Sequence, residues 1–184
     1  MPTLPTRFAA VIAACLLAST GTATAAQADN TAAPAPAATR GGIAHLQTNL
    51  DLQPTPSGTW TDSSLQVTLP RAGTYNLDLD VRGRLQGTPP VDAYIVARLW
   101  NVTSNAALPQ SERLVNQIND RNPGDAQEGR NTTVAISERI TVNSPTTIRL
   151  QAKRVTDLGT TVYAAILSDT DGYTSFRYQS VSPW

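Results

Sequence analysis

Cysteine, histidine and lysine are almost missing from this chain of 184 residues, and each shortage excludes a kind of chemistry. Cys15 is the only cysteine and belongs to the apolar N-terminal stretch, so the rest of the chain can form no disulfide, thiolate nucleophile or cysteine-bound zinc site. His45 is the only histidine, and no Gly-x-Ser-x-Gly segment accompanies it. Most mechanisms that need a histidine base or histidine metal ligands are therefore excluded. We expect a protein without catalytic residues, metal or cofactor.

A clustered basic surface is also missing. Lys and Arg together number 14, equal to Asp and Glu, and Lys153 is the only lysine. Nucleic acids and anionic membranes select proteins with a concentrated basic face. We therefore expect neither as a partner.

The N-terminal residues have the pattern of an export signal. Arg7 is the only charged residue before Asp29, and residues 8–18 form an apolar run. Two cleavage candidates follow, Ala23-Thr24-Ala25 and Ala26-Gln27-Ala28. A positive start, a short apolar stretch and small residues at the cleavage site are typical of a secretory signal. Residues 1–28 are therefore predicted to be a signal peptide, and the mature protein is predicted to be secreted, extracellular and soluble.

The residues after the apolar run are predicted to hold no membrane anchor. Cys15 lies inside the run rather than at its end, so we expect no lipid there, and no segment reaches the ~20 apolar residues of a transmembrane helix. Residues 29–42 contain two prolines, a glycine pair and few apolar side chains larger than alanine, which predicts a flexible spacer. Residues 43–184 then form one domain of common size.

Apolar and polar residues alternate along most of this domain, as in half-buried strands. In residues 74–82 one face carries Tyr75, Leu77, Leu79 and Val81. Residues 93–102 are apolar on both faces, so this strand is predicted to be central or to cover a contact surface. Further strands are predicted at residues 64–69, 134–142, 148–152, 162–167 and 176–181.

Residues that break strands, among them residues 87–90 and Gly159, separate these segments. About eight to ten strands with short turns predict an all-β fold, an antiparallel β-sandwich of jelly-roll type. Residues 111–118 could form a helix instead of a strand, and both alternatives stay open. Residues 116–131 are the least strand-like and are predicted to form a long loop, either mobile or a binding site. Its candidate binding residues are Asp120, Arg121 and Asp125.

Several short motifs resemble the jelly rolls of the tumour necrosis factor and complement globular-head superfamily. Leu69-Pro70-Arg71-Ala72-Gly73-Thr74-Tyr75 is similar to that family's Pro-x-x-Gly-x-Tyr entry into a long strand, and Leu99-Trp100-Asn101 to its strand ending before a turn. An aromatic-rich closing strand follows, from Tyr173 to Tyr178. The resemblance implies a non-enzymatic binding or structural head that often forms a homotrimer.

We therefore expect a secreted or cell-surface module that acts by protein binding or self-assembly. A carbohydrate-binding module is the alternative, because Trp60 or Trp100 could stack on a sugar. A glycoside hydrolase is a second alternative, because Asp78 and Asp80 share one strand face at a spacing that suits a pair of catalytic carboxylates. The sequence identifies neither the ligand nor the partner.

Overall fold

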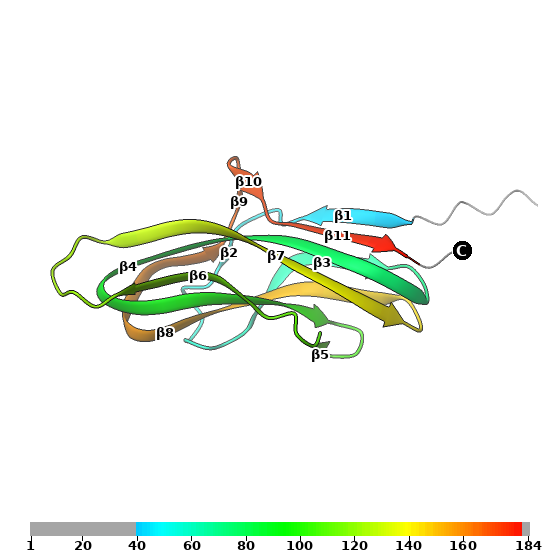
Figure 1. Cartoon of the computed structure of the whole chain (residues 1–184), viewed down its shortest axis with the longest axis horizontal. Helices are drawn as coiled ribbons and strands as arrows, with labels where there is room; N and C mark the ends of the chain where they lie inside the picture. The colour runs from blue at the N-terminus through cyan, green and yellow to red at the C-terminus, as the bar shows by residue number, and fades with distance from the viewer. Residues whose placement is uncertain (1–39, 182–184) are drawn as a thin grey trace, which may run out of the picture. The chain divides into compact units, whose positions relative to one another are not determined.

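Residues 40–181 are described by a computed structural model, and they form antiparallel β-structure (Figure 1). The predicted signal peptide with Cys15, most of the predicted spacer and Trp184 lie outside the described residues. In the described part of the chain no helix is long and apolar enough to cross a membrane. The prediction of an all-β fold is confirmed.

Eleven strands occur within residues 40–181, and four of them have only two residues. They are β1 (Gly41–His45), β2 (Leu50–Asp51), β3 (Thr61–Leu69), β4 (Gly73–Asn101), β5 (Ala106–Ala107), β6 (Arg113–Asp120), β7 (Glu128–Val142), β8 (Thr146–Ile166), β9 (Ser168–Asp169), β10 (Gly172–Tyr173) and β11 (Ser175–Ser180).

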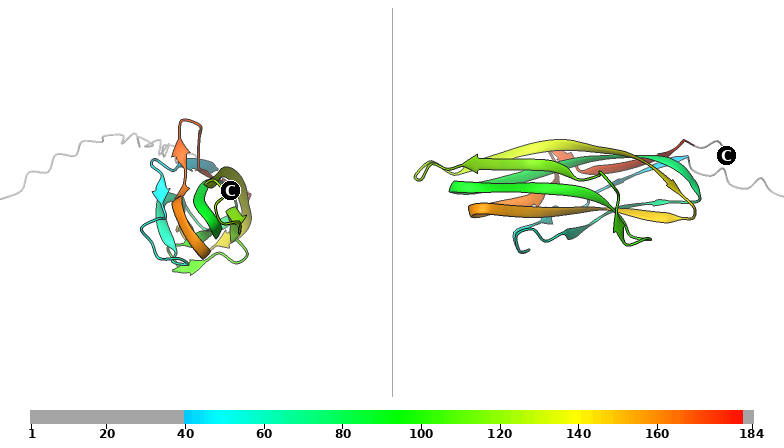
Figure 2. Two further views of the ribbon diagram at one scale, coloured as in Figure 1. Left: turned by 90° about the vertical axis from the view of Figure 1, so that its left-hand side faces the viewer. Right: turned by 60° about the horizontal axis from the view of Figure 1, so that its bottom comes forward.

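The long strands pair in two layers. In the layer called here the first sheet, β1 pairs with β11, β11 with the first half of β4, and that half of β4 with β7. In the second sheet, β3 pairs with β8, β8 with the second half of β4, and that half of β4 with β6. Every pairing is antiparallel, and this order is that of a jelly-roll sandwich. Figure 2 shows the layers end-on, curled around the core.

The hydrogen-bonded ladder is continuous because β4 and β8 run from one layer into the other. The breakers at residues 87–90 and at Gly159 do not end these strands, which reach 29 and 21 residues. Gly159 has φ +69°, and a Cβ there would lie 2.1 Å from the carbonyl oxygen of Pro90. Glycine at this position therefore lets the two strands bend together where they change sheets.

The predicted core face of β4 is buried. The side chains at Tyr75, Leu77, Leu79 and Val81 are at most 1% exposed, as are those at Ile95, Ala97 and Leu99. Phe176 of β11 is also fully buried among them. Burial of each large apolar side chain contributes about 1.5–3 kcal/mol to the free energy of unfolding. Alternation read from the sequence therefore located the core correctly.

The region after Ser111 differs from its prediction, because β6 replaces both the helix and part of the loop. A β-bulge lies opposite Ile95 and Val96 and makes Val115 an extra residue in β6. Val115 and Ile118 are consequently both buried at a spacing of three, which imitates a helical pattern. Since β6 and β7 extend into residues 116–131, only residues 121–127 connect them.

Strand β1 begins at Gly41, inside the range predicted as spacer. The aromatic ring of Tyr178 lies over Gly42, so that a Cβ on Gly42 would approach its Cε1 atom to 2.6 Å. The glycine pair thus permits close packing of β1 against β11. Composition alone predicted flexibility here because it does not reveal which neighbour the backbone meets.

Residues 169–172 (Asp-Thr-Asp-Gly) form a tight turn between β9 and β10. Arg82 of β4 fixes this hairpin: its Nη1 donates to Oδ1 of Asp169 at 2.8 Å and also to the carbonyl oxygen of Gly172. The hydrogen bond from Arg82 to the Asp169 carboxylate is the main reason that the pKa of Asp169 is lowered.

Candidate functional site

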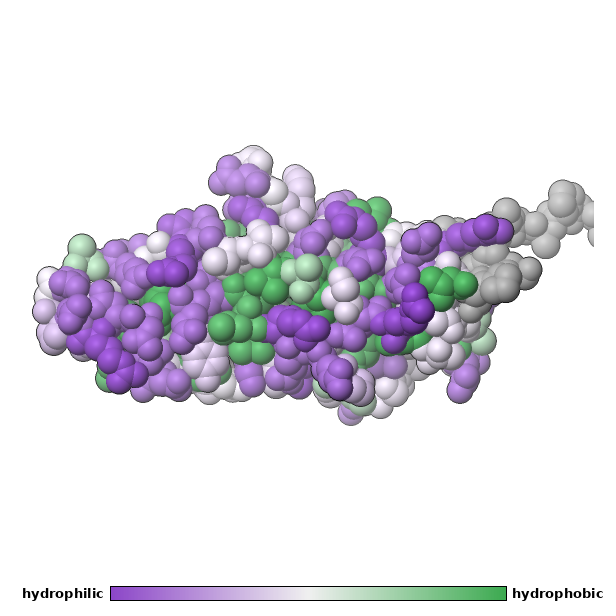
Figure 3. Space-filling view, in the orientation of Figure 1, coloured by the Kyte–Doolittle hydropathy of each residue, from purple (hydrophilic) through white to green (hydrophobic). Residues whose placement is uncertain are grey.

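The outer face of the second sheet carries the apolar side chains predicted to make β4 two-sided. Tyr94, Val96 and Trp100 are partly buried and alternate with fully buried residues that point into the core. Leu114 of β6 pairs with Val96 and is 51% exposed. Figure 3 shows hydrophobic side chains gathered near the middle of the view, where Figure 1 draws β6 and β7 in front of β4, bordered by hydrophilic ones.

Two tryptophans and two cations form a cluster on this face, called here the tryptophan cluster (Trp60, Arg98, Trp100 and Lys153). The Arg98 Cζ atom lies 3.9 Å from the Trp60 ring centroid and 4.9 Å from that of Trp100. Lys153 Nζ lies 4.4 Å from the Trp60 ring centroid. Such contacts contribute about 0.5–1 kcal/mol each at exposed sites. They hold both indoles in place on the sheet surface.

Hydrogen bonds connect the cluster across strands. Arg98 Nε donates to Gln151 at 2.9 Å, and Gln151 Nε2 donates to Asp62 at 2.7 Å. Arg149 donates to the other oxygen of Asp62 at 2.8 Å. Strands β4, β8 and β3 therefore contribute to one polar network beside the aromatic rings.

The two cations of the cluster differ in charge compensation. Arg98 pairs with Glu112 at 3.3 Å, whereas no ion pair is found for Lys153 in the described part of the chain. The positive charge of Lys153 therefore faces the indole of Trp60 without a carboxylate. This arrangement offers a partner an aromatic surface with one uncompensated positive charge.

The outer face of the first sheet has a different character. Its exposed side chains pair as polar residues across the strands: Thr74 with Thr141, Asp78 with Ser137, Asn76 with Arg139 and Asp80 with Arg177. Asp78 and Asp80, the alternative glycosidase pair, thus belong to this hydrogen-bonded surface. The two outer faces of the sandwich are chemically distinct.

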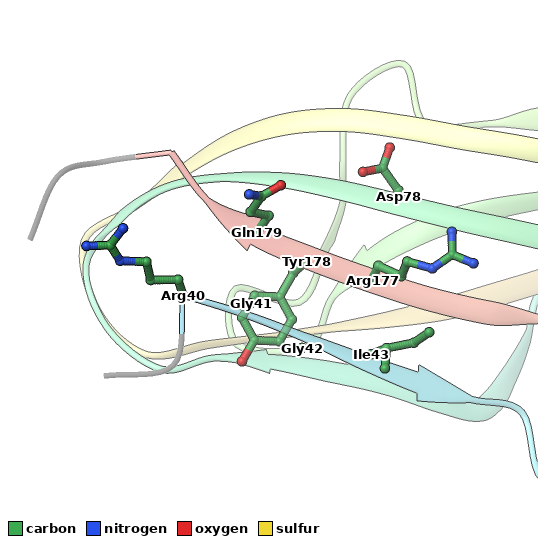
Figure 4. A pocket seen from close by; sticks show the side chains of 8 residues that line it. All are labelled: Arg40, Gly41, Gly42, Ile43, Asp78, Arg177, Tyr178 and Gln179. Atoms are coloured by element: carbon green, nitrogen blue, oxygen red, sulfur yellow. The ribbon is translucent and has the colours of Figure 1, made fainter. Parts of the chain in front are cut away.

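One hollow of about 420 Å³ lies along β1 and β11 on the first sheet (Figure 4). Gly41 and Gly42 form part of its lining, together with Tyr178 and the polar side chains of Asp78 and Arg177. Asp78 lines this hollow but Asp80 does not. The hollow therefore does not contain the carboxylate pair that a glycoside hydrolase needs.

A second hollow of about 300 Å³ lies where β4 bends between the sheets. It is lined by Arg84, Gln86, Gln127, Gly129, Arg130 and Asn131. Four of these residues fall in the range predicted as a long loop. None of them is among the binding residues predicted from the sequence.

The predicted residues near the β6–β7 connection lie apart from the tryptophans. Asp120 is the partner of Val91 in the β4–β6 ladder, and Val91 is about 30 Å from Trp100 at the rise of an extended strand. Arg121 donates to the Asp92 carboxylate at 2.8 Å, and Asp125 is exposed. The structure therefore brings Trp60 and Trp100 together but leaves the three loop candidates as a separate group.

Three residues of the second sheet face were missed by the sequence prediction: Arg98, Leu114 and Lys153. Arg98 could have been found, because it lies two residues before Trp100 and so shares its strand face. Leu114 could not, because the bulge in β6 changes which residues point outward. His45 is exposed and its ring lies edge-on to that of Tyr173, with the centroids 5.8 Å apart. Among the described residues no group of three or more acidic, histidine or cysteine side chains is placed to hold a metal.

No protein-family model matches the sequence, and no curated protein matches it. Solved structures similar to this chain include the infectious bursal disease virus VP2 subviral particle (TM-score 0.41, 77% of this chain and 32% of that one) and T=1 particles derived from infectious bursal virus (0.43, 77% and 31%). A third is the structure of the Gx strain of infectious bursal disease virus, with a TM-score of 0.39 over 78% of this chain and 37% of that one. Sequence identity is 10% in each case, and this chain spans about a third of their length. Their TM-scores are below 0.5, so the jelly-roll assignment rests on the strand pairing described above.

Proposed function

We propose that this chain is an exported, non-enzymatic module that acts by self-assembly through the outer face of its second sheet. The observation that carries the proposal is the contrast between the two outer faces. One is, apart from the exposed Ile43, a polar surface whose side chains pair with each other, and the other carries the tryptophan cluster with Tyr94, Val96 and the exposed Leu114.

The aromatic residues and Arg98 of this face, though not Lys153, are residue types found at interface centres. Protein interfaces are enriched in tryptophan, tyrosine and arginine and depleted in lysine and acidic residues at their core. Tyr94, Arg98 and Trp100 occupy alternate positions of one strand, and Leu114 lies beside them. Because cation–π contacts already orient the two indoles, binding would cost little side-chain entropy.

A homotrimer is the assembly proposed. The short motifs that resemble the tumour necrosis factor and complement globular-head superfamily support this number. The resemblance also supports a function outside the cell, in agreement with the predicted export signal.

The test is a pair of matched substitutions, Leu114→Glu and Ile43→Glu, in the full chain. Both side chains are exposed on strands, by 51% and 54%, but Ile43 lies on the outer face of the first sheet. We expect Leu114→Glu to yield monomers in size-exclusion chromatography and Ile43→Glu to elute like the unmodified protein. Equal behaviour of the two variants would contradict the proposed face.

Carbohydrate binding is the second candidate, favoured by the partial exposure of Trp60 and Trp100 on one face. It predicts a glycan-array signal that Trp100→Ala abolishes without any change in oligomeric mass. Self-assembly predicts the opposite, since Trp100→Ala should weaken the oligomer and glycans should give no signal.

A further inference from the structure

The second hollow is a donor-rich site separate from the assembly face. It lies on the outer side of the first sheet, where Arg84 and Gln86 of β4 face Asn131 and Gly129 of β7 as cross-strand partners. Gln127, in the short connection before β7, closes one side. Its lining therefore comes from two paired strands and one short connection.

No aspartate or glutamate is among the residues that line this hollow, whereas Arg84 and Arg130 both are. Arg130 has an acidic partner, since its Nη2 lies 2.6 Å from Glu128 Oε1. The interaction found for Arg84 is with the ring of Tyr163, 5.3 Å from Arg84 Cζ, and no ion pair is found for it within residues 40–181. The hollow thus contains one positive charge that no side chain neutralises.

The amide groups are arranged to donate as well. Gln86 Nε2 donates to Gln127 Oε1 at 2.6 Å, which leaves the NH₂ group of Gln127 as a free donor in this part of the chain. The amide of Asn131 and the guanidinium of Arg84 add further N–H groups. A concave surface with several donors and a net positive charge suits an oxyanion.

Gly129 keeps the hollow open. A Cβ at this position would lie 2.9 Å from Cγ of Gln86 and would displace that side chain. The volume of about 300 Å³ is at the lower end of about 300–1,000 Å³ for small-molecule sites and exceeds what a bare inorganic ion fills. The space fits a ligand of about the size of one sugar ring.

We propose that this hollow binds a small ligand through an oxyanion group, with the carboxylate or sulfate directed to Arg84 and its polar remainder to the amides of Gln86, Gln127 and Asn131. This activity goes beyond the proposed assembly and uses none of the residues of the tryptophan cluster. It can therefore fail or succeed independently of the oligomeric state.

The test is an NMR titration of the ¹⁵N-labelled full chain with glucuronate, sulfate and glucose at low ionic strength. We expect saturable shifts of the Gln86, Gly129 and Asn131 amides with glucuronate or sulfate, none with glucose, and weaker binding as salt is added. Tighter binding of glucuronate would identify a sugar acid as the ligand type, and tighter binding of sulfate an inorganic oxyanion or a sulfated group. Absence of saturable binding by both anions, or equal binding of glucose, would overturn the proposal.

Two variants and one control assign the site. Arg84→Gln should weaken anion binding about tenfold or more, the effect expected for losing a charge-assisted hydrogen bond. Gly129→Ala should also weaken it, through displacement of Gln86. Arg139→Gln is the matched control, because Arg139 bonds Asn76 on the same sheet face and does not line the hollow. Unchanged affinity in Arg84→Gln, or an equal loss in Arg139→Gln, would contradict the assignment.

Discussion

Arg98 lies over the ring of Trp60, with 3.9 Å between its Cζ atom and the ring centroid, and it also approaches Trp100. A single guanidinium therefore contacts two indoles, one in β4 and one just before β3. This relationship makes the outer face of the second sheet a rigid aromatic surface, although neither indole belongs to the hydrophobic core. The polar pairs of the first sheet provide no comparable surface.

Ser111 is predicted to stabilise the end of β4. Its hydroxyl is fully buried, donates to the carbonyl oxygen of Leu108 at 2.8 Å and accepts from the amide of Leu99 at 3.1 Å. Ser111→Ala should lower the free energy of unfolding by about 1–3 kcal/mol, because it leaves buried polar groups without partners. Urea denaturation measures this, and Ser104→Ala, at an exposed position, should have little effect. Equal stability of both variants would contradict the role of Ser111.

The contact between Arg82 and Asp169 is predicted to make stability depend on pH. The hydrogen bond from Arg82 lowers the pKa of Asp169 in the folded protein below its value of about 3.9 in the unfolded chain. Its stabilisation is therefore present above about pH 4 and is lost as the pH falls through the lowered pKa. Asp169→Asn should reduce the free energy of unfolding at pH 7, and its difference from the unmodified protein should shrink at lower pH.

Asp171→Asn is the control for this prediction, because Asp171 lies in the same turn and contributes its backbone amide to Asp169. It should change stability little at either pH. A difference between Asp169→Asn and the unmodified protein that stays constant from pH 7 to about pH 3 would show that the carboxylate charge is not responsible.

The periodic segments were predictable from the sequence because burial alternates with the strand period. The core face of β4 followed directly from Tyr75, Leu77 and Leu79. The length of β4 was not predictable, because residues 87–90 are of types that usually end a strand. In the structure β4 bends at these residues and continues into the second sheet. In the same way, the spacing of three between Val115 and Ile118 suggests a helix when the β-bulge in β6 is not known.

The candidate site was predictable only in part. Trp60 and Trp100 were identified by residue type, but their shared face depends on the pairing of β3 with β8 and of β8 with β4. Long-range pairing also decides that Lys153 meets Trp60. The residues of the second hollow were not identified, since Arg84 and Arg130 come together only through the ladder of β4 and β7.

Gly42 is predicted to be required for the packing of β1. Gly42→Ala would place a Cβ 2.6 Å from the ring of Tyr178, which also packs edge-on against Tyr75 with their centroids 6.0 Å apart. We expect a loss of about 1–3 kcal/mol in the free energy of unfolding, as for other overpacked sites. Thermal denaturation measures it, and Gln179→Ala on the exposed side of β11 should have little effect. Unchanged stability of Gly42→Ala would contradict the tight packing of Gly42 against Tyr178.

The N-terminal residues are predicted to be removed on export. Expression of the full chain in a secreting bacterial host, followed by intact-mass spectrometry of the medium and cell fractions, should detect a product that begins after Ala28 or after Ala25. Retention of residues 1–25 in the purified product would contradict the export signal. A lipid-modified fragment that begins at Cys15 would instead show that the protein is anchored.

The proposed assembly is tested most directly by the molar mass of the purified protein in solution, measured by light scattering during size-exclusion chromatography over a range of concentrations. The account predicts three times the mass that mass spectrometry gives for the single chain, with dissociation in Leu114→Glu. A mass equal to one chain at every concentration would contradict it, and the outer face of the second sheet would then need another partner.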